Sequence, residues 1–102
     1  MTEIETTTWI LLATAFASQK EPCDINSISM IADGINHSIP TEKELRTSLT
    51  WLINKGLVLK QEKKYRLTVK GITLYELASN STATLLKIWE NLNNELTDTD
   101  LK

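Results

Sequence analysis

The first part of the chain has a helical pattern of apolar positions. Between residues 3 and 18 apolar side chains recur at helical spacing and cover a wide arc: Ile4, Trp9, Ile10, Leu11, Leu12, Ala15 and Phe16. This pattern predicts a helix over Glu3–Ser18. Because the apolar arc is wide, we expect the helix to be covered on more than one side, by other helices of the domain or by a second chain.

A second helical stripe follows after Glu21-Pro22 interrupts the first. Either Asp24 or Asn26 can cap the start of a helix that runs to Asn36, since both side chains accept hydrogen bonds from free backbone N–H groups. The apolar residues of this segment define its predicted inner face: Ile28, Ile31, Ala32 and Ile35.

The third helix has the clearest start signal in the chain. Thr41 and Glu44 make a T-x-x-E capping box, in which each side chain bonds a backbone N–H of the other residue. The helical stripe that follows consists of Leu45, Leu49, Leu52 and Ile53. Lys55 and Gly56 supply a basic last turn and a terminating glycine. We therefore predict a helix from Thr41 to Lys55.

Two short runs with a period of two come next, Leu57-Val58-Leu59 and Tyr65-Arg66-Leu67. The polar segment Gln61-Glu62-Lys63-Lys64 separates them, so the pattern predicts a β-hairpin. No Asn-Gly or Asp-Gly pair fixes its turn, and the register stays open. Thr68 ends the second run and can cap a following helix.

The C-terminal part is helical again. Ile72, Tyr75 and Leu77 give a pattern over Val69–Ala78, which is weakened by Gly71 and interrupted over residues 79–82. A last helix is expected over about residues 82–97, after which the polar tail is expected to fray.

The last helix carries an apolar seam: Leu85, Trp89, Leu92 and Leu96. This seam can form a coiled-coil-like dimer contact or pack against the first helix. One chain alone would find it hard to cover both the seam and the wide arc of the first helix. We therefore expect a homodimer, with these four residues as its interface.

The length and composition limit the class of protein. At 102 residues the chain fits a single domain. The longest apolar run, Trp9–Ala17, is too short to span a bilayer, so we expect no membrane association. The first residues carry acids where a secretory signal carries Lys or Arg, and we expect a cytoplasmic protein.

Candidate chemistry is sparse. Cys23 and His37 are the only residues of their types, so neither an internal disulfide nor a Cys/His metal site can form. His37 could act as a base only with a nucleophile or a substrate in reach. The sequence around it offers only Ser38, in a predicted turn. The three glycines stand far apart and make no phosphate-binding loop. We expect no enzyme activity, no metal and no cofactor.

Charge is segregated along the sequence. The net charge of −2 argues against a nucleic-acid binder if it is taken for the chain as a whole. Residues 41–70, however, hold eight basic and three acidic residues, a net charge of +5, and the remainder carries −7. A basic surface is therefore expected wherever the third helix and the hairpin meet.

The order of these elements resembles the winged helix-turn-helix domains of bacterial regulators such as the MarR and PadR families. The likeness covers roughly Ile25 to Glu76, and eight residues carry it: Leu49, Leu52, Gly56, Leu57, Tyr65, Leu67, Thr68 and Gly71. It implies a mainly α fold with a small β-hairpin, consisting of a three-helix core, a short wing and C-terminal helices. The core would span about residues 4–78.

The resemblance implies that helix 41–55 lies in the major groove of duplex DNA while the wing, residues 57–68, reaches phosphates. The face of that helix opposite its leucines presents Lys43, Arg46, Thr47, Thr50 and Asn54. Arg46 can fork to guanine or clamp a phosphate, and Asn54 can pair with adenine or a phosphate. Lys63, Lys64 and Arg66 would contact phosphates from the wing.

A protein partner is the alternative to DNA. A winged helix can serve as an interaction or assembly module, because the fold does not determine the function. Trp51, at the edge of the third helix, is then either part of the core beside the wing or an exposed aromatic residue at an interface.

Overall fold

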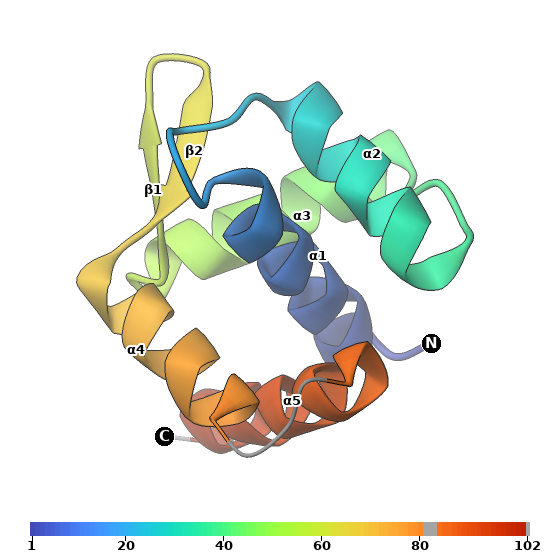
Figure 1. Ribbon diagram of the computed structural model, residues 1–102, viewed down its shortest axis with the longest axis vertical. Coiled ribbons are helices and arrows are strands. Elements are labelled where there is room, and N and C mark those ends of the chain that lie inside the picture. The colour runs from blue at the N-terminus through green and yellow to red at the C-terminus, as the bar shows by residue number, and fades with distance from the viewer. Residues whose placement is uncertain (81–83, 102) are drawn as a thin grey trace.

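The computed structural model describes residues 1–80 and 84–101 of the chain (Figure 1). In chain order the elements are α1 (Glu3–Ala17), α2 (Ile25–Asn36), α3 (Glu42–Asn54), β1 (Val58–Gln61), β2 (Lys64–Leu67), α4 (Val69–Ser79) and α5 (Leu85–Leu101). The fold is mainly helical with a small antiparallel hairpin, an arrangement compatible with a winged helix. The predicted start of the last helix at Thr82 lies outside the described residues.

α1 is the central helix. It packs against α2, α3 and α5 (Figure 1). Its middle part, from Thr7 to Ala15, is buried. The indole Nε1 of Trp9 donates a hydrogen bond to the Ala32 carbonyl of α2 at 2.9 Å. The wide apolar arc predicted for α1 is thus covered by helices of the same chain.

Side-chain caps form at the starts of α1, α2 and α3. At α3, Oγ1 of Thr41 accepts from the Glu44 N–H at 3.0 Å, and Oε1 of Glu44 accepts from the Thr41 N–H at 2.9 Å, which confirms the predicted capping box. α1 has a capping box of the same kind, formed by Thr2 and Glu5, that was not predicted. Of the two candidate caps for α2 the structure selects Asp24.

α3 ends as its Lys55-Gly56 sequence predicts. Gly56 has a φ of 75°, the left-handed conformation that glycine adopts at least cost. The N–H of Leu57 donates to the Leu52 carbonyl at 2.9 Å and that of Gly56 to Ile53 at 3.0 Å. These two bonds form a Schellman motif, which turns the chain directly into the hairpin.

Thr68 ties the base of the hairpin to α4. Its Oγ1 donates to the Gly56 carbonyl at 2.6 Å and accepts from the Gly71 N–H at 3.0 Å, so one hydroxyl closes the hairpin and caps α4. Gly71 lies against the same region, since a Cβ built on it would approach the Leu57 carbonyl oxygen to 2.1 Å. The α4 helix can start this close to the hairpin only because residue 71 has no side chain.

The two strands of the hairpin are each longer than predicted, and its tip is shorter. Its register pairs Val58 with Leu67 and Gln61 with Lys64, which leaves Glu62 and Lys63 as a two-residue turn. Glu62 has a φ of 60°, so the turn forms without the glycine or asparagine that such turns favour.

A third chain segment pairs with the hairpin. Cys23 forms an isolated antiparallel bridge with Tyr65, in which each backbone N–H donates to the other carbonyl at 2.9 Å and 2.7 Å. This bridge lies on the edge of β2 away from β1, because both backbone groups of Tyr65 point away from its β1 partner Lys60. The segment between α1 and α2 is thereby fixed to the hairpin.

One predicted core position is wrong. Ile31, which was predicted on the inner face of α2, is exposed. In α4 two of the apolar residues that indicated the helix, Ile72 and Leu77, are exposed as well. The buried residues of α4 are the small ones, Gly71 and Ala78, and at Gly71 the Leu57 carbonyl lies too close for any side chain. Ile31 lies at the margin of the stripe formed by Ile28, Ala32 and Ile35 of α2.

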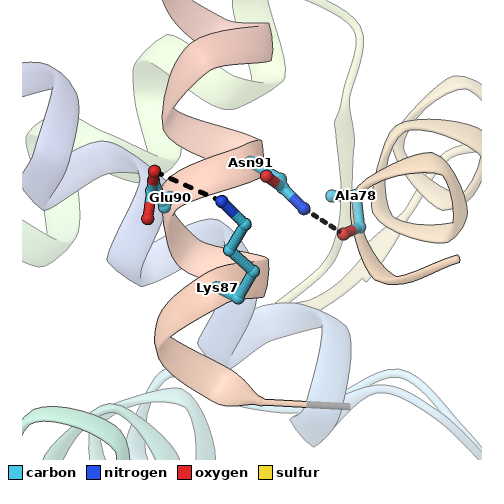
Figure 2. A network of polar contacts seen from close by, with 4 residues as sticks. All are labelled: Ala78, Lys87, Glu90 and Asn91. Carbon is cyan, nitrogen blue, oxygen red and sulfur yellow. Dashed lines mark hydrogen bonds and ion pairs between the residues drawn. The ribbon is translucent and has the colours of Figure 1, made fainter. Parts of the chain in front are cut away.

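α5 packs across α1 and α4, and it continues to Leu101, so the prediction of a frayed tail is wrong. The side-chain amide of Asn91 donates to the Ala78 carbonyl at 2.8 Å and satisfies an end carbonyl of α4 (Figure 2). No helix in the described part of the chain is long and apolar enough to cross a membrane.

Candidate nucleic-acid interface

The predicted contact residues of α3 share one exposed face. The capping box and the buried residues Leu45, Leu49 and Leu52 fix the rotation of α3 against the core. The opposite side therefore presents all five predicted side chains to solvent: Lys43, Arg46, Thr47, Thr50 and Asn54.

The hairpin divides the predicted wing residues between its two faces. Directly opposed residues of an antiparallel pair lie on the same face, so Lys64 shares the outer face with Gln61, and Arg66 shares it with Leu59. Lys60 and Tyr65 are opposed on the other face, where Tyr65 is buried. The predicted set Lys63, Lys64 and Arg66 is therefore not one surface.

A groove lies between the exposed face of α3 and the inner face of the hairpin, with a volume of about 440 Å³. From α3 it is lined by Arg46 and Thr50, and from the hairpin by Lys60 and Lys63. Three basic side chains from two elements thus converge on one groove. Lys64 and Arg66 lie instead along a second hollow on the outer face of the hairpin.

Sequence reasoning missed Lys60. Its ammonium lies 5.6 Å from the centre of the Tyr65 ring, a cation–π contact that holds the side chain on the α3 side of the hairpin. The signal that would have found it is the period of two: once Lys60 is registered opposite Tyr65, both side chains must lie on one face. The open register prevented that step.

Arg46 forms an ion pair within its own helix. Its guanidinium donates to Oε1 of Glu42 through Nε at 2.9 Å, and Nη2 lies 2.8 Å from the same oxygen. Both side chains are largely exposed, and pairs of this kind contribute only about 0.3–0.5 kcal/mol. The guanidinium can therefore exchange Glu42 for a phosphate or a base edge at small cost.

Asp24 places a carboxylate at the end of the groove next to α2. Its Oδ1 accepts a hydrogen bond from the Ser27 N–H at 2.8 Å, and this bond lowers the pKa of Asp24. The nearby Lys64 contributes to the lowering of that pKa. Asp24 is thus a fixed anion that caps α2 and limits the basic part of the groove to the side of α3 and the hairpin tip.

The predicted dimer seam is mostly used within the chain. Leu92 and Leu96 are completely buried in a single chain, and Trp89 stacks on Trp9. Only Leu85 of the four seam residues is exposed. An interface through Leu92 and Leu96 is thus not available, because other parts of the same chain cover both. The helix packs against α1, the other possibility for this seam, and also against α4.

The remaining chemistry is modest. Cys23 is buried, and that burial raises the pKa of its thiol, which disfavours the reactive thiolate. Within residues 1–80 and 84–101, no three His, Cys, Asp or Glu side chains lie close enough together to hold a metal ion.

Comparison with known proteins adds no relative. No family model, no curated protein and no solved structure matches this chain. The functional argument therefore depends on the geometry of the chain itself.

Proposed function

We propose that this protein is a winged-helix transcriptional regulator that binds duplex DNA through α3 and the β1–β2 hairpin and performs no chemistry of its own. One observation carries the proposal: Arg46 of α3 and Lys60 and Lys63 of the hairpin converge on one groove. Duplex DNA presents dense negative charge, and binding to it is dominated by such lysine and arginine contacts.

α3 is a suitable helix for the major groove. The major groove of DNA is about 12 Å wide and admits one α-helix. The exposed face of α3 carries hydrogen-bonding groups along its length. In this position Asn54 and Arg46 reach base edges or phosphates, and Lys43 reaches a phosphate at the start of the helix. Thr47 and Thr50 offer hydroxyl and methyl groups between them.

The acids of α3 do not prevent this binding. Oε1 of Glu44 is held by the Thr41 N–H in the capping box, and Glu42 is paired with Arg46. Each carboxylate is thus held by a partner of its own helix end, and only Glu42 has a positive charge beside it. The hairpin contributes two lysines to the groove, so the phosphate-facing surface is basic overall.

A double variant and a single control variant test the proposal. Lys60→Ala/Lys63→Ala removes the lysines of the groove, and Lys64→Gln removes a lysine of the same hairpin on its outer face. In fluorescence anisotropy with a random-sequence duplex, the double variant should bind more weakly and reduce the salt slope by about two, because each lost phosphate contact changes it by about 0.9. Lys64→Gln should leave the slope within about half a unit of the wild type. Equal losses in both variants would contradict the groove as the DNA site.

A second candidate function is supported by exposed apolar side chains on α4 and at the start of α5. They are Val69, Ile72, Leu77, Leu85 and Leu86. An interaction module would offer such a surface to a protein partner. If the chain forms the expected homodimer, these side chains, and not Leu92 or Leu96, are available to the second copy. This function predicts no duplex binding at low salt.

A further inference from the structure

A shallow hollow lies on the exposed face of α3 itself, with a volume of about 420 Å³. Of its lining residues, Arg46 comes first along the helix and Asn54 last, with Thr47, Thr50 and Trp51 between them. Trp51 follows Thr47 by four residues and precedes Asn54 by three, so these side chains are neighbours on the helix surface. The Trp51 ring and the two threonine methyl groups thus form an apolar patch, here called the α3 patch, in the middle of the predicted DNA-contacting face.

Trp51 differs from the other two tryptophans of the chain. Trp9 and Trp89 each donate the indole N–H to a backbone carbonyl. Trp51 is half-buried, and in the described part of the chain no residue accepts a hydrogen bond from its indole N–H. No sealed side-chain nitrogen lacks a partner among those residues, so this N–H is open to solvent. Trp51 therefore offers both apolar ring surface and an unused donor to a partner.

Positive charge borders the α3 patch. The Lys55 ammonium lies 5.4 Å from the centre of the Trp51 ring, a cation–π contact within α3 and its C-terminal cap. Arg46 lines the same hollow as Trp51. An apolar centre with cations at its border matches the major groove of DNA, where phosphates line the rims and base edges form the floor.

Thymine is the base that fits the α3 patch. Its C5-methyl group is exposed in the major groove and is contacted there by apolar surface such as a threonine methyl. Beside this methyl it presents the O4 acceptor, which suits the unused Trp51 donor, whereas a methylated cytosine presents an amino donor at that position. Arg46 and Asn54 stand about 12 Å apart along the helix axis, roughly three base-pair steps, so the patch faces the base pairs between those that they reach.

We infer that Trp51, together with Thr47 and Thr50, makes this protein select duplex sites with thymine methyl groups in the major groove. The inference rests on the proposed function, because the α3 patch meets base edges only if α3 enters that groove. It adds a sequence preference to phosphate contacts, which carry none. Burial of one methyl group changes an affinity about fourfold, so contact with a single thymine is measurable.

Duplexes that differ only in methyl groups test the inference. An alternating A·T duplex presents a thymine methyl at every base pair, so every register of α3 meets one, and the A·U duplex keeps all the hydrogen-bonding groups. In fluorescence anisotropy at about 50 mM salt, the wild type should bind the A·T duplex at least about fourfold more tightly than the A·U duplex. Methylation of cytosine at C5 in an alternating G·C duplex should raise the affinity by a smaller factor.

Variants of α3 assign the preference to the patch. Trp51→Ala should lower the ratio of the A·T to the A·U affinity toward one. Because Trp51 is half-buried, Thr47→Ser/Thr50→Ser is the second variant: it removes two methyl groups at exposed positions, keeps both hydroxyls, and should also lower this ratio. Thr73→Ser, the same change at an exposed position of α4, should keep the ratio of the wild type.

The outcomes separate this inference from the proposed function. Equal affinities of the wild type for the A·T and A·U duplexes would overturn the inference and leave duplex binding intact. A preference for A·T that persists in both α3 variants would assign it to duplex shape and overturn the role of the patch. A larger gain from methylated cytosine than from thymine would overturn the choice of base. No binding to any of these duplexes would overturn the proposed function, and this inference with it.

Discussion

The ring of Trp89 in α5 stacks on that of Trp9 in α1, with 6.3 Å between the ring centres and 21° between their planes. Each indole N–H also bonds a backbone carbonyl, Trp9 that of Ala32 at 2.9 Å and Trp89 that of Glu5 at 3.2 Å. The pair therefore joins α5, α1 and α2 within one chain. α5 is part of the core of the monomer and not an arm that waits for a second chain.

Truncation of Leu92 should therefore destabilise the single chain. Leu92→Ala should lower the free energy of unfolding by about 2–5 kcal/mol, because a fully buried leucine leaves a cavity. Leu86→Ala, at an exposed position on the same helix, should change it by less than about 0.5 kcal/mol. Urea denaturation measures both. A midpoint that rises with protein concentration and a small effect of Leu92→Ala would show instead that α5 is stabilised by a partner chain.

Two glycines should respond oppositely to alanine. Gly34 lies within α2 with open space where a Cβ would be, so Gly34→Ala should stabilise the protein by about 0.5–1 kcal/mol. Gly71→Ala should destabilise it by about 1–3 kcal/mol, since the new Cβ would be forced against the Leu57 carbonyl. Urea denaturation of both variants checks the signs. A stable Gly71→Ala protein would contradict the close approach of α4 to the base of the hairpin.

Glu42 should restrain DNA binding by Arg46. Glu42→Gln removes the carboxylate that lies 2.8 Å from the Arg46 guanidinium, and it also removes a negative charge near the phosphates. We expect about a twofold gain in duplex affinity, since exposed pairs are worth about 0.3–0.5 kcal/mol.

Glu90→Gln is the matched control for this prediction. Glu90 pairs with Lys87 at 3.5 Å on α5, away from the groove. Glu90→Gln changes the net charge by the same amount as Glu42→Gln. Its duplex affinity should equal that of the wild type. An equal gain in both variants would assign the effect to net charge and not to the release of Arg46.

The cap of α2 should make stability depend on pH in acid. The hydrogen bond from the Ser27 N–H holds the pKa of Asp24 below its unfolded value. The stability that Asp24 contributes is therefore fully present above the unfolded pKa and is lost as the pH falls through the folded pKa. Asp24→Asn keeps a capping side chain but does not titrate.

The measurement for this prediction is urea denaturation of both proteins across the acid range. The difference in stability between wild type and Asp24→Asn should shrink below about pH 4. Most of it should survive in high salt at neutral pH, because a direct hydrogen bond is screened little. A difference that is constant with pH would contradict the ionised cap.

The elements of the fold could be predicted because their signals are local. Thr41 with Glu44, Gly56 and Thr68 each fix a helix end or a turn through bonds to neighbouring backbone groups, and all of these signals were identified from the sequence. The exposed face of α3 follows from helical periodicity alone. These predictions did not require knowledge of which elements pack together.

The predictions that failed depend on contacts between distant segments. The assignment of Leu92 and Leu96 to a dimer failed because both are buried within the single chain, and helical spacing alone cannot identify the partner of a seam. Lys60 was missed because the register of the hairpin was open. The buried side of α4 did not follow from its apolar pattern, because the closeness of residue 71 to the Leu57 carbonyl requires a glycine there.

The most direct test of the proposed function is anisotropy of a labelled random-sequence duplex titrated with the wild-type protein at about 50 mM and about 200 mM salt. With Lys43, Arg46, Lys60 and Lys63 in contact with phosphates, the affinity should fall by about two orders of magnitude between the two salt concentrations. Absence of binding at the lower salt concentration would contradict the DNA-binding function and would favour a protein partner at the exposed side chains of α4 and α5.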